Sequence, residues 1–154
     1  MFQQAYITYN DNAAVVYFTD KAWTTFIYND AVRVLPMTLT KELREQRQMF
    51  CLKLTGIPRG ASARDLLVYL GNINAKTCFI PRNANNYNKL NYAYVNFLSD
   101  DDLVKASETH HSLKGSPLYW VPADQQTCNF CGSPDHFAKG CNAKRQQVNR
   151  NKKY

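Results

Sequence analysis

The clearest β-strand in the sequence is Tyr92-Ala93-Tyr94-Val95-Asn96-Phe97. Aromatic and β-branched residues are enriched in strands, and here apolar side chains also recur at every second position. Because successive side chains of a strand point to opposite faces, Ala93, Val95 and Phe97 should turn toward a hydrophobic core. Tyr92 and Tyr94 should then turn toward the other face. The strand therefore predicts a sheet with one buried face and one tyrosine-bearing face.

The residues before this strand predict three further elements. Cys51–Thr55 alternates apolar and polar side chains and is expected to be the first strand of the domain. Ser62-Ala63-Arg64-Asp65 is a capping-box sequence, and the leucines that follow it recur at helical spacing. Residues 76–82 are expected to form a second strand, and the asparagine-rich residues 83–91 a loop.

The residues after the strand predict a second helix and a last strand. Ser99 and the three aspartates that follow it supply an N-cap and the negative charge that a helix N-terminus favours, which explains them better than a divalent-metal site does. This helix is expected to extend to about Leu113 and to stop at Gly115, and Leu118–Val121 is expected to be the fourth strand. The order strand, helix, strand, strand, helix, strand predicts a ferredoxin-like α+β domain, with two helices on one face of a four-stranded antiparallel sheet.

The first 36 residues align with the second half of the same domain. Ala5–Tyr9 matches Ala93–Phe97, and Val34–Pro36 matches Trp120–Pro122, with a helix-like stretch between them. We therefore expect residues 1–36 to be a partial copy that begins at its third strand, and the chain to be a fragment or a truncated reading frame. The alternative is that a short strand-rich segment matches by chance.

Composition and charge favour an intracellular protein with a polyanionic partner. Hydrophobic residues make up 45% of the chain, enough for a core, and no apolar run is long enough to span a bilayer. The net charge is +7, and residues 128–154 hold six basic side chains against one acidic one. Such a basic tail suits nucleic acid, or else it is a solvated tail that aids solubility. An odd number of cysteines argues against a disulfide framework and for a location in the nucleus or cytoplasm.

A cluster of cysteines and one histidine follows the domain. Its members are Cys128, Cys131, His136 and Cys141, in the spacing C-x2-C-x4-H-x4-C. Three thiolates and one imidazole complete the tetrahedral coordination of a structural Zn²⁺, and no position stays open for a catalytic water. Gly132 allows the backbone to fold under the metal. We therefore expect one structural Zn²⁺ ion and no catalysis at this site.

Residues 128–141 resemble the retroviral-type CCHC zinc knuckle. The resemblance implies that Phe130 and Phe137 stack on unpaired bases. In that family the residue before the histidine is usually glycine and the residue after the first cysteine is often aromatic, whereas this chain has Asp135 and Asn129. These two departures weaken any expected base specificity but not the metal site.

Residues 50–124 resemble the RNA recognition motif. The resemblance rests on the octamer Leu90–Phe97 and the hexamer Leu52–Ile57, and it implies that Tyr92 and Tyr94 stack successive bases of single-stranded RNA. The aromatic position of the hexamer holds Lys53, a charge suited to a phosphate. Strands also favour tyrosine for packing alone, which is the structural alternative.

The sequence thus predicts five segments and one set of RNA contacts. The segments are a partial motif-like copy (1–36), a polar and helical linker (37–48), an RNA recognition motif (49–124), a zinc knuckle (127–142) and a basic disordered tail (143–154). The expected contacts are Tyr92, Tyr94, Lys53, Lys89, Asn96, Phe130, Phe137, Lys139, Lys144 and Arg145. The predicted function is single-stranded RNA binding without catalysis, without a small-molecule substrate and without a membrane partner.

Two kinds of family combine such modules: the Gag-like RNA-binding proteins of LINE-type retroelements, and splicing factors with one motif and one knuckle. An RS-rich tail would favour the splicing factors, and the sequence has none. One alternative is a protein-interaction adaptor whose knuckle alone binds nucleic acid, and Lys53 in place of an aromatic residue favours it. Another is a nucleocapsid-like protein that binds both RNA and single-stranded DNA. An enzyme ranks third, because no nucleophile has a recognisable partner and His110-His111 face different ways on a helix.

Overall fold

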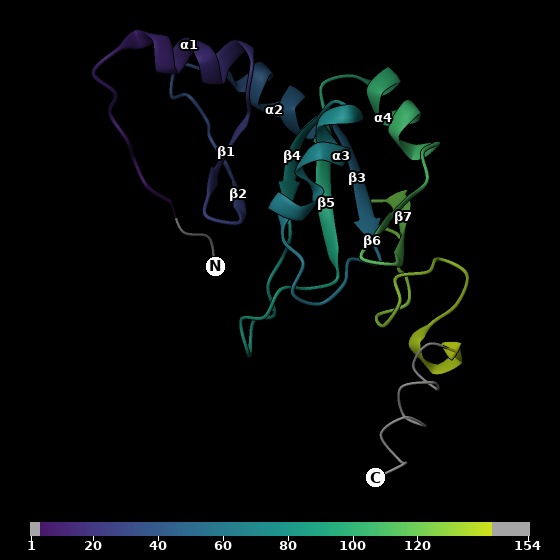
Figure 1. Ribbon diagram of the computed structural model, residues 1–154. Helices are drawn as coiled ribbons and strands as arrows, with labels where there is room; N and C mark the ends of the chain where they lie inside the picture. Colours follow the sequence, from purple (N-terminus) through teal and green to yellow (C-terminus); the bar gives the residue numbers. More distant parts are fainter. Residues whose placement is uncertain (1–3, 143–154) are drawn as a thin grey trace.

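The computed structural model describes residues 4–142 and contains an antiparallel sheet of five strands in the order β4-β5-β3-β7-β6 (Figure 1). The order of elements along the chain, β3-α3-β4-β5-α4-β7, confirms the predicted ferredoxin-like α+β arrangement. The strands are β3 (Phe50–Thr55), β4 (Ala75–Phe79), β5 (Tyr92–Phe97), β6 (His111–Leu113) and β7 (Ser116–Pro122). The helices are α3 (Leu67–Asn72), which continues a 3-10 turn over Ala63–Leu66, and α4 (Asp100–Ser107).

Strand β5 lies between β4 and β3, and its side chains point alternately into the core and toward the opposite face of the sheet. Ala93, Val95 and Phe97 are 0% exposed, as their spacing predicts. On the opposite face Tyr94 lies across from Lys53 of β3 and Phe79 of β4. We call this face, away from the helices, the open face. The core behind it also contains Leu52, Leu54, Leu66, Leu70 and Ala106.

Helix α4 is shorter than predicted. It ends at Ser107, and residues 111–113, which were expected in the helix, form β6 and pair with β7. Lys114 and Gly115 have φ angles of 50° and 80°, the backbone of a two-residue hairpin turn. The hairpin pairs the backbone of residues 111–113, and the ring of His111 stacks on Tyr69 with 4.0 Å between ring centres. The pairing of this hairpin and the contact with the distant Tyr69 together outweigh a pattern that locally resembles a helix end.

Strand β4 also ends earlier than predicted, at Phe79 and not at Arg82. Pro81 has no N–H to donate to a sheet, so the ladder cannot continue through it. The chain pairs again only at a single bridge between Arg82 and Lys89, and the residues between them form the predicted loop.

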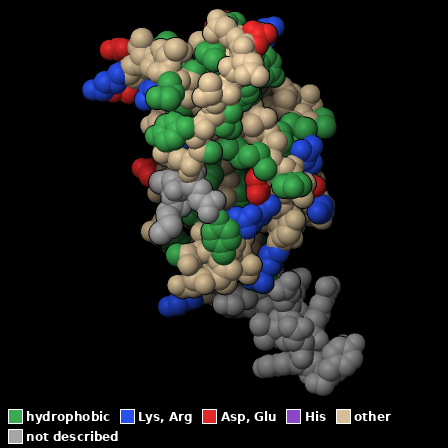
Figure 2. All heavy atoms as spheres, turned by 90° about the vertical axis from the view of Figure 1, so that its left-hand side faces the viewer, with side chains coloured by type: hydrophobic (Ala, Val, Ile, Leu, Met, Phe, Trp, Pro, Cys, Tyr) green, Lys and Arg blue, Asp and Glu red, His purple; other side chains and the backbone are tan. Residues whose placement is uncertain are grey.

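The N-terminal part consists of helix α1 (Asn12–Asp20) and a hairpin of β1 (Thr24–Ile27) and β2 (Asp30–Arg33). This helix–hairpin order is also that of α4, β6 and β7. The strand expected over Ala5–Tyr9 is not formed, because no strand within residues 4–142 pairs with it. Val34–Pro36, expected to be a strand, lies just beyond β2. Figure 2 faces this part and shows hydrophobic side chains at its surface. Tyr28, in the turn between β1 and β2, is 89% exposed.

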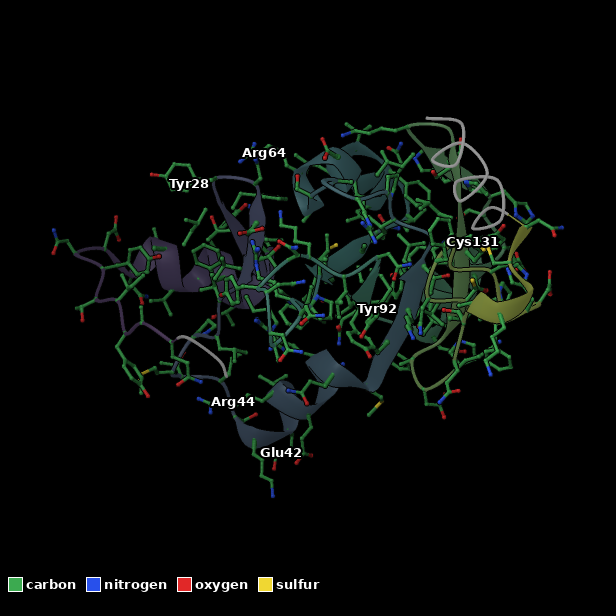
Figure 3. All side chains as sticks on the ribbon, turned by 90° about the horizontal axis from the view of Figure 1, so that it is seen from below. Tyr28, Glu42, Arg44, Arg64, Tyr92 and Cys131 are labelled. Carbon is green, nitrogen blue, oxygen red and sulfur yellow. The ribbon has the colours of Figure 1, made fainter. Side chains whose placement is uncertain are left out.

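Helix α2 (Lys41–Met49) occupies the stretch expected to be a polar, helical linker and joins the N-terminal part to the sheet. Its Arg47 is buried, and the guanidinium donates to the carbonyl oxygens of Phe18 (2.6 Å) and Val34 (3.1 Å) while it lies 5.0 Å from the centre of the Trp23 ring. Glu42 and Arg44, on the outer side of α2, point away from the protein (Figure 3). Among residues 4–142, helices are too short or too polar to cross a membrane.

Candidate nucleic-acid interface and metal site

Four side chains that follow β7 converge into one cluster. The Sγ atoms of Cys128, Cys131 and Cys141 and a ring nitrogen of His136 all lie within 4.8 Å of one another. The Sγ of Cys131 is 3.3 Å from Nε2 of His136, so this nitrogen faces the thiols. Tetrahedral Zn²⁺, with Zn–S bonds of about 2.3 Å and Zn–N bonds of about 2.0 Å, would hold its ligand atoms roughly 3.5–3.8 Å apart. The cluster could therefore hold a metal ion.

The backbone around the cluster is folded to receive a thiolate. The N–H groups of Phe130 and Cys131 point at the Sγ of Cys128 from 3.4 and 3.5 Å, and such donors stabilise negative charge on sulfur. Cys128 and Cys141 are each 1% exposed. Burial raises the pKa of the Cys131 thiol to about 11, so this sulfur stays protonated at neutral pH unless a cation lies beside it. We call residues 128–141 the knuckle.

The knuckle packs against the end of β3. The hydroxyl of Thr55 donates to the carbonyl oxygen of Gly132 over 2.6 Å, in a buried position. The amide of Asn91, the residue before β5, donates to the carbonyl oxygen of Asn129 over 3.0 Å. Figure 3 shows Cys131 of the knuckle close to the end of β3, where Tyr92 also lies. The Cys3His cluster is therefore attached to the sheet through side-chain hydrogen bonds as well as through the chain itself.

Tyr92 and Tyr94 stand side by side on the open face, as the alternation predicts. Their ring centres are 5.7 Å apart and their planes are nearly perpendicular, at 82°. The pKa of Tyr92 is raised mainly by burial and, to a lesser extent, by the neighbouring Tyr94. The ammonium of Lys53 lies 4.4 Å from the centre of the Tyr92 ring and donates to the carbonyl oxygen of Gln125. One face of Tyr92 is thus covered by a cation in this structure.

Two residues expected to contact RNA are engaged inside the protein. The side-chain amide of Asn96 donates to the backbone carbonyl of Arg47 in α2 (2.9 Å) and accepts from the hydroxyl of Thr77 (2.9 Å). The ammonium of Lys89 lies 3.1 Å from the carboxylate of Asp30 in β2. Arg47 and Asp30 belong to elements N-terminal to the domain, and Thr77 belongs to β4. The octamer and hexamer alone do not indicate the position of these partners.

The remaining expected contacts lie on or after the knuckle. Phe137 is 65% exposed, Phe130 is half-buried and Lys139 is exposed. Lys144 and Arg145 lie outside the described residues.

The open face carries two further aromatic residues that the sequence analysis did not single out. Phe79 of β4 is 39% exposed, and the guanidinium of Arg33 in β2 lies 5.9 Å from its ring centre. Tyr119 of β7 lies opposite Thr55, and burial, Cys131 and Asp135 raise its pKa in that order of importance. The alternation within β4 and β7 was the available signal, but the strand register that places these rings on the open face follows only from the pairing.

Two elements flank the open face. Helix α2 contacts it at Asn96, and the knuckle contacts it at Thr55. The side chains between these two contacts are Lys53, Phe79, Tyr92 and Tyr94. What remains is a short aromatic and basic surface, bounded at both ends.

The fold and the cluster define a ferredoxin-like α+β domain with an attached Cys3His cluster that could hold a metal ion. No family model matches this chain, and no curated protein matches it. Its fold is similar to those of several solved structures. One is RNA recognition domains 1 and 2 of Sex-lethal from Drosophila melanogaster, with 23% identity, a TM-score of 0.43 and a match that covers 48% of this chain and 49% of that one.

Two other solved structures have a similar fold. The Glorund qRRM3 domain is 16% identical with a TM-score of 0.42, and the match covers 48% of this chain and 92% of that one. The RNA-binding domain of Hrp1, in complex with RNA, is 16% identical with a TM-score of 0.42, and the match covers 49% of this chain and 48% of that one. The matched part thus spans about half the length of Sex-lethal and of Hrp1 in those structures.

Proposed function

We propose that this protein binds single-stranded RNA on the open face, with the knuckle and the basic tail adding contacts and with no catalysis. The observation that carries the proposal is the pair of adjacent tyrosines on an uncovered sheet face, with Lys53 beside them. Bases stack on aromatic rings in a sequence-tolerant way, at about 1–3 kcal/mol per base. We propose an intracellular location for this activity.

The metal in this proposal is one structural Zn²⁺, held by Cys128, Cys131, Nε2 of His136 and Cys141. Three thiols and an imidazole are a donor set that suits zinc, and the spread of the ligand atoms fits a tetrahedral site. With four protein ligands the site has no open position for water or substrate. The role of the metal is to fold the knuckle, so that Phe130 and Phe137 are presented in fixed positions.

The basic tail supplies the salt-sensitive part of the affinity. Lysine and arginine side chains release counterions from a nucleic acid backbone without reading its sequence. Lys139 at the end of the knuckle and Lys144 and Arg145 after it are assigned to phosphate contacts. This part of the binding would not distinguish RNA from single-stranded DNA.

A protein-interaction adaptor is the second candidate function. It is favoured by one observation, the ammonium of Lys53 over the Tyr92 ring, which occupies a stacking position. An adaptor whose sheet does not bind RNA would keep only the affinity of its knuckle and tail.

The decisive experiment replaces both tyrosines with alanine. We expect Tyr92→Ala with Tyr94→Ala to weaken binding of a mixed-sequence single-stranded RNA by tenfold or more, because about 1.4 kcal/mol corresponds to a factor of ten. Tyr28→Ala is the matched control, since that ring is 89% exposed on the N-terminal hairpin, and it should leave the affinity unchanged. Unchanged affinity in a folded double variant would favour the adaptor.

A further inference from the structure

The knuckle and the end of β3 meet at two glycines, and the space between the two backbones is too small for a side chain. Gly132 has a φ of +80°, and a Cβ there would come within 2.6 Å of the Cα of Gly56. Gly56 itself has a φ of +86°, and a Cβ there would come within 3.2 Å of the carbonyl oxygen of Cys131. The two backbones therefore touch directly, with the buried hydrogen bond from Thr55 beside them.

The position of this contact on the sheet is defined by the strand register. Thr55 lies opposite Tyr92 of β5 on one side and opposite Tyr119 of β7 on the other. Gly132 rests on Thr55, so the knuckle occupies the part of the open face between those two rings. A nucleotide cannot lie across Thr55, and an RNA strand on the open face must leave it beside the knuckle.

A second hydrogen bond places an aromatic residue at that exit. Asn91 immediately precedes Tyr92, and its side chain holds the carbonyl of Asn129, which immediately precedes Phe130. This bond brings the residue before Phe130 beside the residue before Tyr92, so the chain places Phe130 at the end of β5 where Tyr92 lies. Adjacent strand residues on one face are about 6.6 Å apart, and the Tyr92 and Tyr94 ring centres are 5.7 Å apart, a spacing suited to successive bases.

From these contacts we infer that the sheet and the knuckle form one rigid RNA-binding surface. A single RNA strand runs from Tyr94 over Tyr92 to Phe130. The contact of Gly132 with Thr55 fixes the distance between the two tyrosines and Phe130. This inference rests on the proposed function and adds that the two parts do not bind as independently moving modules. Two binding sites joined by a flexible tether lose conformational entropy when RNA binds to both. Two sites held rigidly together avoid that loss.

The test disrupts the contact between the knuckle and the sheet without changing the metal ligands or the aromatic residues. The double variant Thr55→Val with Asn91→Ala removes both side-chain hydrogen bonds to the knuckle and alters no metal ligand and no aromatic residue. Thr109→Val is the matched control, because that hydroxyl donates to Ala106 on the helix side of the sheet. Retention of the cobalt–thiolate absorption after Co²⁺ substitution establishes that the knuckle of each variant remains folded.

Two measurements follow on wild type and both variants. Residual dipolar couplings of backbone amides should fit one alignment tensor for sheet and knuckle in wild type and in Thr109→Val, and two tensors in the double variant. Affinities are measured for mixed-sequence RNA of three and of eight nucleotides. We expect the double variant to bind the octamer about tenfold more weakly and to bind the trimer with an affinity within a factor of two of wild type.

The possible failures are distinguishable. If the double variant shows two tensors but binds the octamer as wild type does, the joint surface is wrong while RNA binding stands. If the wild-type couplings need two tensors, the sheet and the knuckle move independently and the inference is overturned. If the couplings of the double variant still fit one tensor, the contact of Gly132 with Thr55 does not fix the knuckle, and that part of the inference is overturned. If wild type binds neither RNA, the proposed function fails, and with it the inference that rests on it.

Discussion

Lys53 offers a quantitative test of the proposed binding of RNA to the open face. Its ammonium lies 4.4 Å from the centre of the Tyr92 ring and 3.2 Å from the carbonyl oxygen of Gln125. A cation–π contact at a partly exposed site contributes about 0.5–1 kcal/mol, and a hydrogen bond from a half-exposed ammonium contributes about 0.5–1 kcal/mol after solvent screening. Replacement of Lys53 with methionine should therefore lower the free energy of unfolding by about 1–2 kcal/mol.

The effect of Lys53→Met on RNA binding should depend on salt. A base that stacks on Tyr92 must first displace the ammonium, which then becomes free to meet a phosphate. Loss of one phosphate contact lowers the slope of log K against log salt by about 0.7 for a single strand. The variant should bind more weakly than wild type at low salt, and the difference should shrink as salt rises.

The assay is fluorescence anisotropy of a labelled single-stranded RNA between about 50 and 400 mM salt, a range over which counterion release dominates the affinity. Lys105→Met, an exposed lysine on α4 behind the core, removes the same charge away from the open face and should leave the slope unchanged. An unaltered slope in Lys53→Met would falsify a phosphate contact by Lys53. An equal reduction in both lysine variants would mean that only net charge matters.

Three further predictions concern stability. Replacement of Arg47 with methionine removes three charge-assisted hydrogen bonds, to the carbonyl oxygens of Phe18, Thr19 and Val34. We therefore expect amide exchange to accelerate in residues 12–33 by at least tenfold while β3 and β5 stay protected, and equal acceleration everywhere would contradict this. Burial raises the pKa of the Cys78 thiol to about 12, so its neutral form stabilises the fold below about pH 9, and that stability is lost as pH rises toward 12, by about 1.4 kcal/mol per pH unit. Urea titrations at pH 8 to 11 should show a steeper loss of stability in wild type than in Cys78→Ala, and parallel curves would refute it. Finally, a zinc chelator should lower the melting temperature of the sheet domain as well as unfold the knuckle, because Gly132 covers Thr55; scanning calorimetry that shows an unchanged main transition after metal removal would argue against this coupling.

The features visible in the sequence were those set by local chemistry. The alternation of Ala93, Val95 and Phe97 with two tyrosines fixes the faces of β5, since the period of a strand is two residues. The spacing of the three cysteines and His136 indicates the metal cluster for a similar reason, because the reach of each ligand depends on a short chain segment.

The features missed by sequence reasoning depend on contacts between distant segments. Asn96 appears available on an open face until α2 places the backbone of Arg47 beside it, and Lys89 appears to be a free cation until Asp30 of the N-terminal hairpin pairs with it. The end of α4 was misplaced although the hairpin partner of residues 111–113 is close in sequence, because the ring that stacks on His111 is Tyr69, in the distant helix α3. None of these partners leaves a local pattern in the sequence.

The glycine contact has a consequence for modularity. A short segment whose four metal-ligand residues lie close together in the chain could fold around its ion without help from a neighbouring domain. Here Gly132 leaves no room for a side chain against Gly56, and removal of the segment would leave the hydroxyl of Thr55 without its acceptor, the carbonyl of Gly132. A transplanted unit would need to reproduce this backbone surface as well as its four ligands. Gly56, Thr55 and Gly132 should therefore be inherited together, so the natural unit of exchange is the sheet and the metal-binding segment as one piece.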